Sequence, residues 1–296
     1  MKLRAWTIGY WPQREWIERR GILVWLAEVS TSLGAGLYLA SLYFDSLIGL
    51  LVGWLIIVVL KIPLHLAFFG KPLRFWRTVP PFTDRWKTSW FTRGIIFTML
   101  FSGFGLLQLI FSFLLPGSVL DISFKVLAGI FAFLVGIYSG LIMNRVKAIP
   151  FWNSALLPVL LITSAVLYGF ALLLILGLIG ADINIQALKP IILTLLVINA
   201  FFLAIYVLGA TYMGPAGQEA VNRLNHFPTA AIFWVGLVTL GIILPFAVSV
   251  AGYLVENISP ALLILGVAGR MVGAFSLMYC WLKVGIYRPL LESVAP

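Results

Sequence analysis

The sequence has few charged residues for its length. Only 10% of its 296 residues are charged, 62% are hydrophobic, and the mean hydropathy is +1.07. A soluble domain of ordinary composition is about half apolar and roughly a quarter charged. This composition excludes a soluble globular protein, and we expect the lipid bilayer rather than a nucleic acid as the surrounding partner.

Cysteine and histidine are nearly absent. The chain has one cysteine, Cys280, and two histidines, His65 and His226. Iron–sulfur clusters are held mainly by cysteine thiolates, and b-type haems usually by paired histidines. We therefore expect no haem, no iron–sulfur cluster and no metal site in this chain.

The apolar residues form eight long runs separated by polar breaks. A transmembrane helix needs roughly 20 predominantly apolar residues. The predicted spans are 22–44, 46–69, 93–115, 124–143, 153–178, 188–212, 229–255 and 260–286. The predicted fold class is all-α, a polytopic membrane helical bundle with about eight transmembrane helices and no space for a separate soluble catalytic domain.

The spans also suggest how the chain is organised. We expect an N-terminal cytoplasmic or interfacial segment at 1–21, a membrane domain at 22–286 and a C-terminal tail at 287–296. Within the membrane domain, the first four spans (about 22–143) form one four-helix bundle and the last four (about 153–286) form a second. Serine, glycine and alanine at spacing four, as in Ser32, Gly36 and Ala40, indicate close helix approach.

Basic residues are concentrated on one face of the predicted bundle. An even number of spans places both termini on one side, called side A, with the connections at 70–92, 144–152 and 213–228; the opposite face is side B. Sixteen lysines and arginines fall on side A, and only Lys125 and Lys189 fall on side B. By the positive-inside rule, side A and both termini are predicted to be cytoplasmic in a multi-pass protein of the cell (inner) membrane.

The connection at 70–92 is rich in arginine and tryptophan. These residues are enriched in the hot spots of protein interfaces, so the segment is also a candidate docking surface. The alternative is a topology signal combined with an interfacial aromatic belt, and the two interpretations are compatible. The candidate docking residues are Arg74, Arg77, Trp86, Trp90 and Arg93.

Four polar side chains from three spans share one depth near side A: Glu28, Lys61, His65 and Tyr138. Ionisable groups inside a membrane usually pair with each other or mark a functional site. One interpretation is a structural ion pair between Glu28 and Lys61, with His65 reaching to the interface. The other is a site for a quinone, which needs hydrogen-bonding and proton-exchanging groups in an otherwise apolar pocket.

A second polar level lies nearer the middle of the membrane. Asn199 and Arg270 are each about ten residues from side B, so we expect that they can meet. Arg270 either hydrogen-bonds Asn199 and backbone carbonyls or belongs to a proton or ion pathway. The second possibility underlies an alternative function for the whole chain, a secondary transporter or ion-translocating membrane protein.

Four strings in the sequence carry a family resemblance. They are "STSLGAGLYLAS" at 30–41, "GKPLRFWR" at 70–77 followed by "TSWFTRG" at 88–94, and "IYSGLIMNRVKAIPFWNSALLPVLLITSA" at 137–165. Together they resemble the NrfD/PsrC-type integral membrane subunits of respiratory oxidoreductases such as polysulfide reductase. The resemblance covers the first five predicted spans and is weak in the last three.

The resemblance implies an anchor subunit that binds menaquinone or ubiquinone and exchanges electrons with a docked iron–sulfur subunit. That partner would serve a molybdopterin-type catalytic subunit, so this chain would take part in electron transport without acting on the soluble substrate alone. In this family, quinone contacts come from the first helix and from a tyrosine on the fourth, which Tyr138 matches. On the first helix, in "ILVWLAEVS", Glu28 is the only ionisable group, and it is proposed from the residues themselves.

The resemblance and the charge distribution disagree about orientation. In polysulfide reductase the quinone site and the docked iron–sulfur protein face outward, whereas the basic residues place the same side in the cytoplasm here. Either this chain works with a cytoplasmic enzyme, or its basic surface serves an acidic partner.

Overall fold

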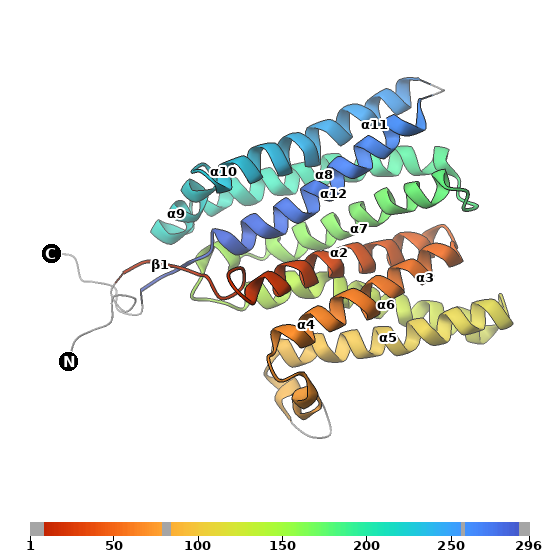
Figure 1. The fold of residues 1–296 in the computed structure, drawn as a ribbon, viewed down its shortest axis with the longest axis horizontal. Helices are drawn as coiled ribbons and strands as arrows, with labels where there is room; N and C mark the ends of the chain where they lie inside the picture. The colour runs from red at the N-terminus through yellow and green to blue at the C-terminus, as the bar shows by residue number, and fades with distance from the viewer. Residues whose placement is uncertain (1–8, 79–83, 256–257, 290–296) are drawn as a thin grey trace.

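Eight helices in the computed structural model are long and apolar enough to cross a membrane, counted over residues 9–78, 84–255 and 258–289, which the structure describes. This confirms the predicted fold class (Figure 1). The spans are α2 (Gly21–Tyr43), α3 to α4 (Leu47–Phe68), α5 (Trp90–Leu114), α6 (Val119–Asn144), α7 (Leu156–Leu178), α8 (Ile185–Ala210), α10 to α11 (Thr229–Leu254) and α12 (Pro260–Lys283).

Shorter elements connect the spans, mostly on side A. They are β1 (Trp11–Pro12), η2 (Pro72–Thr78), η3 (Arg85–Lys87), η4 (Pro150–Trp152), α9 (Gly214–Leu224) and β2 (Ile286–Tyr287). The helix α9 and the two-residue strands were not among the predicted elements. Parts of the predicted terminal segments, 1–8 and 290–296, and part of the predicted docking loop, 79–83, lie outside the described residues.

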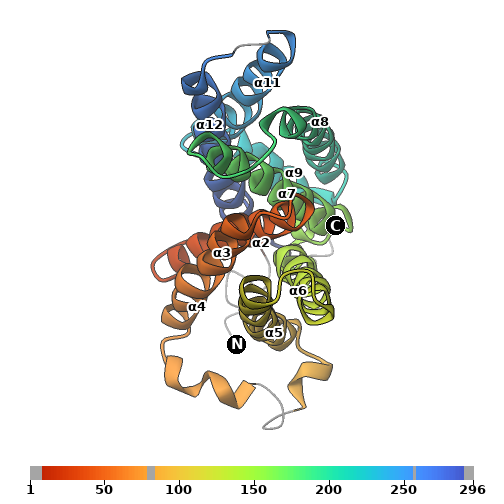
Figure 2. The same ribbon diagram turned by 90° about the vertical axis from the view of Figure 1, so that its right-hand side faces the viewer.

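The helices form two groups that meet along α2 and α7. Figure 2 looks along the helices from side B and shows α2 to α6 on one side and α7 to α12 on the other. We call these groups the first and second bundles. At the seam, a Cβ atom on Gly36 would overlap the backbone of Ala165, and one on Gly169 would overlap the backbone of Gly36. Glycine therefore allows the α2 and α7 backbones to touch.

Two spans contain π-helical turns shortly before a proline. The span from α3 (Leu47–Leu55) to α4 (Ile62–Phe68) has its π-helical segment η1 at Ile56–Lys61, before Pro63. The span from α10 (Thr229–Ala231) to α11 (Leu244–Leu254) has η5 at Ile232–Ile243, before Pro245. Proline removes one backbone N–H and crowds the carbonyl four residues earlier, so a wider turn relieves the clash.

The start of α6 differs most from its predicted position, at residue 119 instead of 124. The Ser118 hydroxyl caps the helix by accepting the Asp121 backbone N–H at 3.2 Å. The Asp121 carboxylate accepts the Gly117 N–H at 2.9 Å and lies 3.4 Å from Lys125. Asp121 lies before the predicted start and adds a charge next to the apolar run, but capping and its pairing with Lys125 allow it to sit in the first turn of the helix.

A chain of hydrogen bonds runs inward from this end of the first bundle. Ser112 donates to Asp121, Gln108 Nε2 donates to Ser112 at 2.7 Å, and Tyr38 donates to Gln108 Oε1 at 2.8 Å. Tyr38, Gln108 and Asp121 are all buried. The network satisfies polar groups that would be costly to bury without partners.

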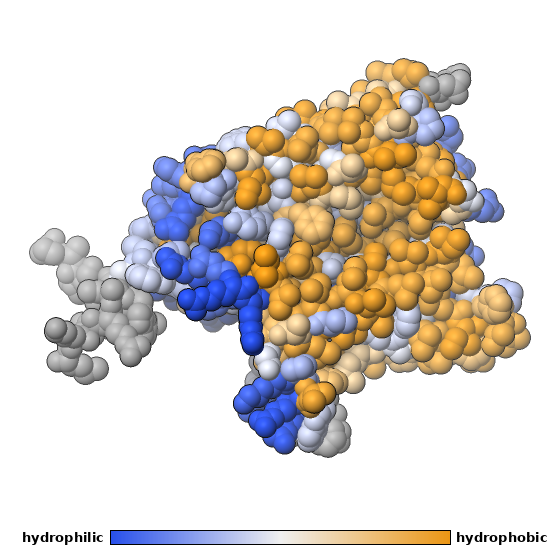
Figure 3. All heavy atoms as spheres, in the orientation of Figure 1, coloured by the Kyte–Doolittle hydropathy of each residue, from blue (hydrophilic) through white to orange (hydrophobic). Residues whose placement is uncertain are grey.

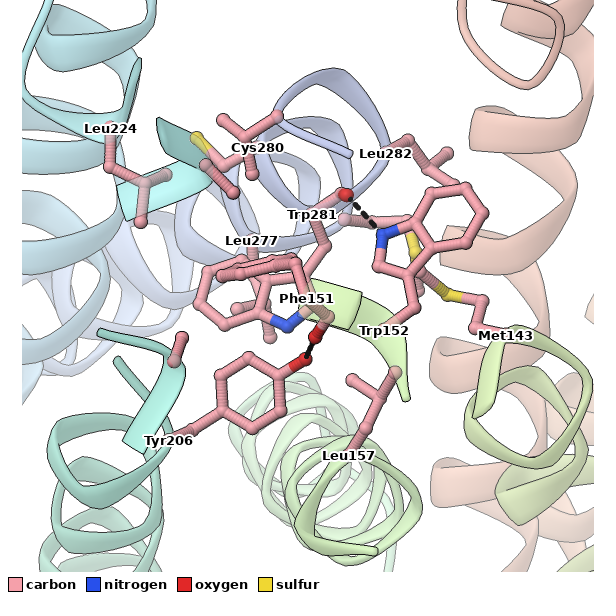
Figure 4. Close-up of a cluster of buried hydrophobic side chains, with 14 of the residues drawn as sticks. Met143, Phe151, Trp152, Leu157, Tyr206, Leu224, Leu277, Cys280, Trp281 and Leu282 are labelled. Carbon is pink, nitrogen blue, oxygen red and sulfur yellow. Dashed lines mark hydrogen bonds between the residues drawn. The ribbon is translucent and has the colours of Figure 1, made fainter. Parts of the chain in front are cut away.

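The largest aromatic side chains pack at the side A end of the second bundle (Figure 4). The Trp152 indole donates to the Trp281 carbonyl at 2.8 Å, and the Tyr206 hydroxyl donates to the Phe151 carbonyl. Next to this core, β1 and β2 pair antiparallel, with Trp11 opposite Tyr287. The segments before α2 and after α12 are therefore joined on side A.

The surface reflects the division into membrane and aqueous regions. Figure 3 shows hydrophobic residues over most of the helical face, and hydrophilic residues gathered at the side A end and around the segment that follows α4. The exposed apolar side chains of the helices face the region that lipid would occupy.

Candidate functional site

A pocket of about 310 Å³ lies near side A in the first bundle, between η1, α4, α5 and α6. Its polar lining comes from Lys61, His65, Thr98, Ser102 and Tyr138, and the rest is apolar or aromatic. The remaining lining residues are Ile62, Leu66, Phe69, Phe75, Phe91, Gly94, Ile95 and Met99. Three of the four predicted quinone-site residues, Lys61, His65 and Tyr138, therefore line one pocket.

The pocket opens toward the lipid-facing surface. Met99 is 49% exposed, and it lies on the outer side of α5. Phe69 and Phe91 pack edge to face, with ring centroids 5.1 Å apart, and form the side A end of the lining. An apolar molecule dissolved in the bilayer can therefore reach the polar groups without crossing water.

Glu28 lies behind this lining rather than in it. Its side chain is buried on α2, where one carboxylate oxygen is 3.5 Å from His65 Nε2 and the other accepts a hydrogen bond from the Ser139 hydroxyl. The other ring nitrogen of His65, Nδ1, is 3.2 Å from the Lys61 carbonyl oxygen. Both nitrogens of His65 thus face oxygen acceptors, and Glu28 contacts the pocket through His65.

Lys61 has a different partner from the one suggested by the structural interpretation. Its buried ammonium group donates to the Thr98 hydroxyl, which in turn donates to the Gly94 carbonyl at 2.8 Å. Within the described part of the chain, the ion-pair partner of Glu28 is His65 and not Lys61. The expectation of a Glu28–Lys61 ion pair with His65 at the interface is therefore wrong.

Tyr138 is held against α5 by the absence of a side chain at Gly94. A Cβ atom on Gly94 would overlap the end of the Tyr138 ring that carries the hydroxyl. Tyr138 itself is only 6% exposed. Gly94 therefore sets how closely the tyrosine ring approaches α5, a role that the sequence reasoning did not assign.

Thr98 and Ser102 were also missed from the sequence. They lie four residues apart on α5, so both face the pocket, and each hydroxyl also donates to a backbone carbonyl of the preceding turn. Hydroxyl groups satisfied in this way are common in apolar helices and give a weak signal. Only their spacing from each other and from Gly94 could have indicated a shared face.

The predicted docking residues are divided between two short segments and the start of α5. Arg74 and Arg77 lie on η2, and Arg77 is 5.2 Å from the Trp76 ring centroid. Arg93 donates to the carbonyls of Trp86 and Lys87, at 3.0 and 2.6 Å.

Trp90 contacts two cations. The guanidinium of Arg93 lies 4.8 Å from its ring centroid, and that of Arg145 lies 5.1 Å from it. Arg93 and Trp90 therefore help to fold this connection, while Arg74 and Arg77 lie on its exposed part.

The structure brings Asn199 and Arg270 together in the second bundle. Arg270 donates to the Asn199 side-chain oxygen at 2.7 Å and to the Gly241 carbonyl, and its guanidinium lies 4.9 Å from the Tyr168 ring centroid. Asn199 in turn donates to the Ser164 hydroxyl at 2.7 Å. This cluster belongs to the second bundle, separate from the pocket near Tyr138.

The side chains that could ligate a metal are scattered through the described residues. No group of three or more histidine, cysteine, aspartate or glutamate side chains is placed there to hold a metal ion. Cys280 is buried in the side A core of the second bundle, whereas His65 is in the first bundle. The absence of haem and iron–sulfur clusters stays a prediction.

Eight helices able to span a membrane define an integral membrane protein, and the mostly apolar pocket with its few polar side chains is its candidate ligand site. Residues 37–289 match the sequence model of the NrfD family, described as polysulphide reductase, NrfD. Since the match covers most of the chain, the protein belongs to the NrfD family. It is a membrane subunit of the NrfD/PsrC type, as the resemblance predicted.

The protein is also similar to the C subunit of polysulfide reductase from Wolinella succinogenes. The two are 28% identical over 160 residues, which make up 49% of this chain and 49% of the relative. The chain thus spans about half the length of this curated relative. The family match extends beyond the first five spans, which carry the resemblance, because it continues through the last three spans to residue 289.

Proposed function

We propose that this chain is the quinone-interacting membrane subunit of a multi-subunit respiratory oxidoreductase. It would pass electrons between the quinone pool and a docked iron–sulfur subunit, which would serve a molybdopterin-type catalytic subunit. The observation that carries the proposal is the lipid-open pocket lined by Lys61, His65 and Tyr138. Membership of the NrfD family supports the same function.

The pocket suits the head group of menaquinone or ubiquinone. Small-molecule sites have volumes of about 300–1,000 Å³, are mostly apolar and contain a few polar groups that fix orientation. A volume of about 310 Å³ fits one ring system, and the opening at Met99 leaves an isoprenoid tail in the bilayer. The polar groups come from both sides of the pocket, since Lys61 and His65 lie on one span and Tyr138 on another.

A quinone and its quinol are interconverted by two electrons and two protons. The residues of this chain supply positions for those protons. The Tyr138 hydroxyl can donate a hydrogen bond to an oxygen in the pocket, and Lys61, held by Thr98, places a positive charge beside it. His65 can hold a proton against Glu28, which is itself positioned by Ser139. Glu28 therefore acts as a positioning residue for His65.

The substitution Tyr138→Phe tests this proposal. Removing one hydrogen-bond donor of ordinary strength should weaken the binding of a quinol analogue about two- to twelvefold, corresponding to about 0.5–1.5 kcal/mol. The measurement is a titration of the purified complex, with electron transfer from quinol recorded in the same samples. Tyr206→Phe is the matched control, because it removes a buried tyrosine hydroxyl in the second bundle.

The control should lose thermal stability and retain the affinity of the complex for the quinol analogue. If Tyr138→Phe binds the analogue and turns over as the unmodified complex does, Tyr138 is not a quinone ligand. If purified preparations contain the chain without any iron–sulfur protein under gentle conditions, the proposed electron-transfer partner is rejected. A transporter, the alternative function, would purify in that way.

We propose the cytoplasmic orientation for side A, in the cell membrane. The support is that sixteen basic residues are assigned to side A and only two to side B. Reporter enzymes that are active only in the cytoplasm or only outside it, fused in turn to the side A connection at 144–152, would test it. Activity of the external reporter at that position would show that side A faces outward.

A further inference from the structure

Arg270 is a buried positive charge in a bundle whose membrane-spanning helices contain no acidic residue. It is 2% exposed, and none of the spans α7, α8, α10 to α11 and α12 contains aspartate or glutamate. Within the described residues, no carboxylate lies within ion-pair distance of its guanidinium. Charges inside a membrane protein are costly and usually have a partner of opposite sign.

Neutral groups accept hydrogen bonds from only some of the N–H donors of this guanidinium. One terminal nitrogen donates to Asn199 and the other to the Gly241 carbonyl. That carbonyl lies four residues before Pro245, which has no N–H to donate to it. The Arg270 Nε atom is buried and has no hydrogen-bond partner among the described residues.

A narrow cavity of about 30 Å³ reaches Arg270 from side B. Its lining includes Lys189 near the start of α8, Ser249 on α11 and Arg270 on α12. Lys189 lies ten residues before Asn199 on α8, a separation of about 15 Å along the helix. Water needs about 10–15 Å³ of such volume, so the cavity can hold one small ion in place of one or two water molecules.

The geometry points to a binding site for a small monovalent anion, such as chloride, beside Arg270 in the second bundle. The anion would enter from side B past Lys189, accept a hydrogen bond from the Arg270 Nε–H and neutralise the guanidinium. The apolar lining and the positive charges at both ends exclude cations. This site is separate from the proposed quinone pocket, and neither depends on the other.

Exchange of chloride for gluconate at constant ionic strength and pH tests the site. Gluconate is too large for the cavity, so it serves as the non-binding anion. The melting temperature of the purified complex, followed by tryptophan fluorescence, should rise with chloride concentration and reach a plateau, because a ligand that binds only the folded state stabilises it. Crystals prepared in bromide should show an anomalous scattering peak beside Arg270.

Variants connect the effect to the two cations. Lys189→Gln should raise the half-saturating chloride concentration by up to about sixfold, from the Coulomb attraction at about 15 Å with an effective dielectric constant of about 20. Arg270→Gln should abolish the chloride dependence. Lys125→Gln is the matched control on the same face of the membrane, and it should leave the chloride dependence unchanged.

Equal melting curves in chloride and gluconate, without a bromide peak, would overturn the proposal and leave the cavity to water alone. A chloride effect that survives Arg270→Gln would place the anion elsewhere and also overturn it. If Arg270→Gln does not fold, the bromide peak and the Lys189→Gln titration decide, since Lys189 is partly exposed near the membrane surface.

Discussion

Adding a single methyl group at Gly94 should disturb the proposed quinone site while leaving the fold intact. In Gly94→Ala the new Cβ would overlap the hydroxyl end of the Tyr138 ring, so that ring has to move away from α5. Overpacking of this kind typically costs about 1–3 kcal/mol. The higher helix propensity of alanine offsets about 0.8–1 kcal/mol of that cost. The net loss of stability is therefore about 0–2 kcal/mol.

Gly94→Ala should also weaken ligand binding. Moving the Tyr138 hydroxyl out of hydrogen-bonding range removes about 0.5–1.5 kcal/mol, which corresponds to about a two- to twelvefold loss of affinity for a quinol analogue. Gly103→Ala is the matched control on the same helix, because a Cβ atom at Gly103 meets no other atom within 4 Å. That variant should bind the analogue normally and be as stable as the parent or more so.

A double variant separates the tyrosine from other effects of the methyl group. If Gly94→Ala acts by moving the Tyr138 hydroxyl, then adding it to Tyr138→Phe should cause little further loss of affinity. Analogue titrations and melting curves on the parent, the two single variants and the double variant give the affinities and stabilities to compare. Equal affinities for Gly94→Ala and Gly103→Ala, or fully additive losses in the double variant, would refute the reasoning.

Three further expectations concern other parts of the chain. Charge reversal at Arg74 and Arg77 should release the iron–sulfur partner at moderate salt, whereas reversal at Lys147, another exposed side A cation, should not. If the partner still co-purifies after reversal of both arginines, the charges of η2 serve only to orient the chain in the membrane. Glu28→Gln should lower quinol turnover and remove one ionisation from the pH–rate profile of quinol oxidation. An unchanged profile with a lower melting temperature would mean that Glu28 only stabilises the packing of the helices. Gln108→Leu should lower the free energy of unfolding by about 1–3 kcal/mol because Tyr38 loses its acceptor, as denaturation would show.

Hydropathy was sufficient to predict the membrane helices. Seven of the eight spans begin within three residues of the predicted position, because the length of an apolar run is set by the bilayer and not by neighbouring helices. The exception, α6, begins earlier because Asp121 and Lys125 are satisfied by local capping and pairing. A count of charges cannot distinguish a charge that ends a helix from one that caps it.

Depth along the helices predicted part of the candidate site. Lys61, His65 and Tyr138 share a level, and the structure places all three in one pocket. The partner of Glu28 was not predictable in this way because it depends on helix rotation. The π-helical segment at 56–61 ends at Lys61, where Lys61 contacts Thr98 on α5 and His65 contacts Glu28 on α2.

The contact between Gly36 and Gly169 has a mechanical consequence. At this point the backbones of α2 and α7 meet directly, with no side chain between them that could change its rotamer to absorb a displacement. A tilt of one bundle must then be transmitted to the other, or the two bundles must rotate as rigid bodies about this contact. A displacement of α2 would in that case reach α7, where Tyr168 lies against Arg270.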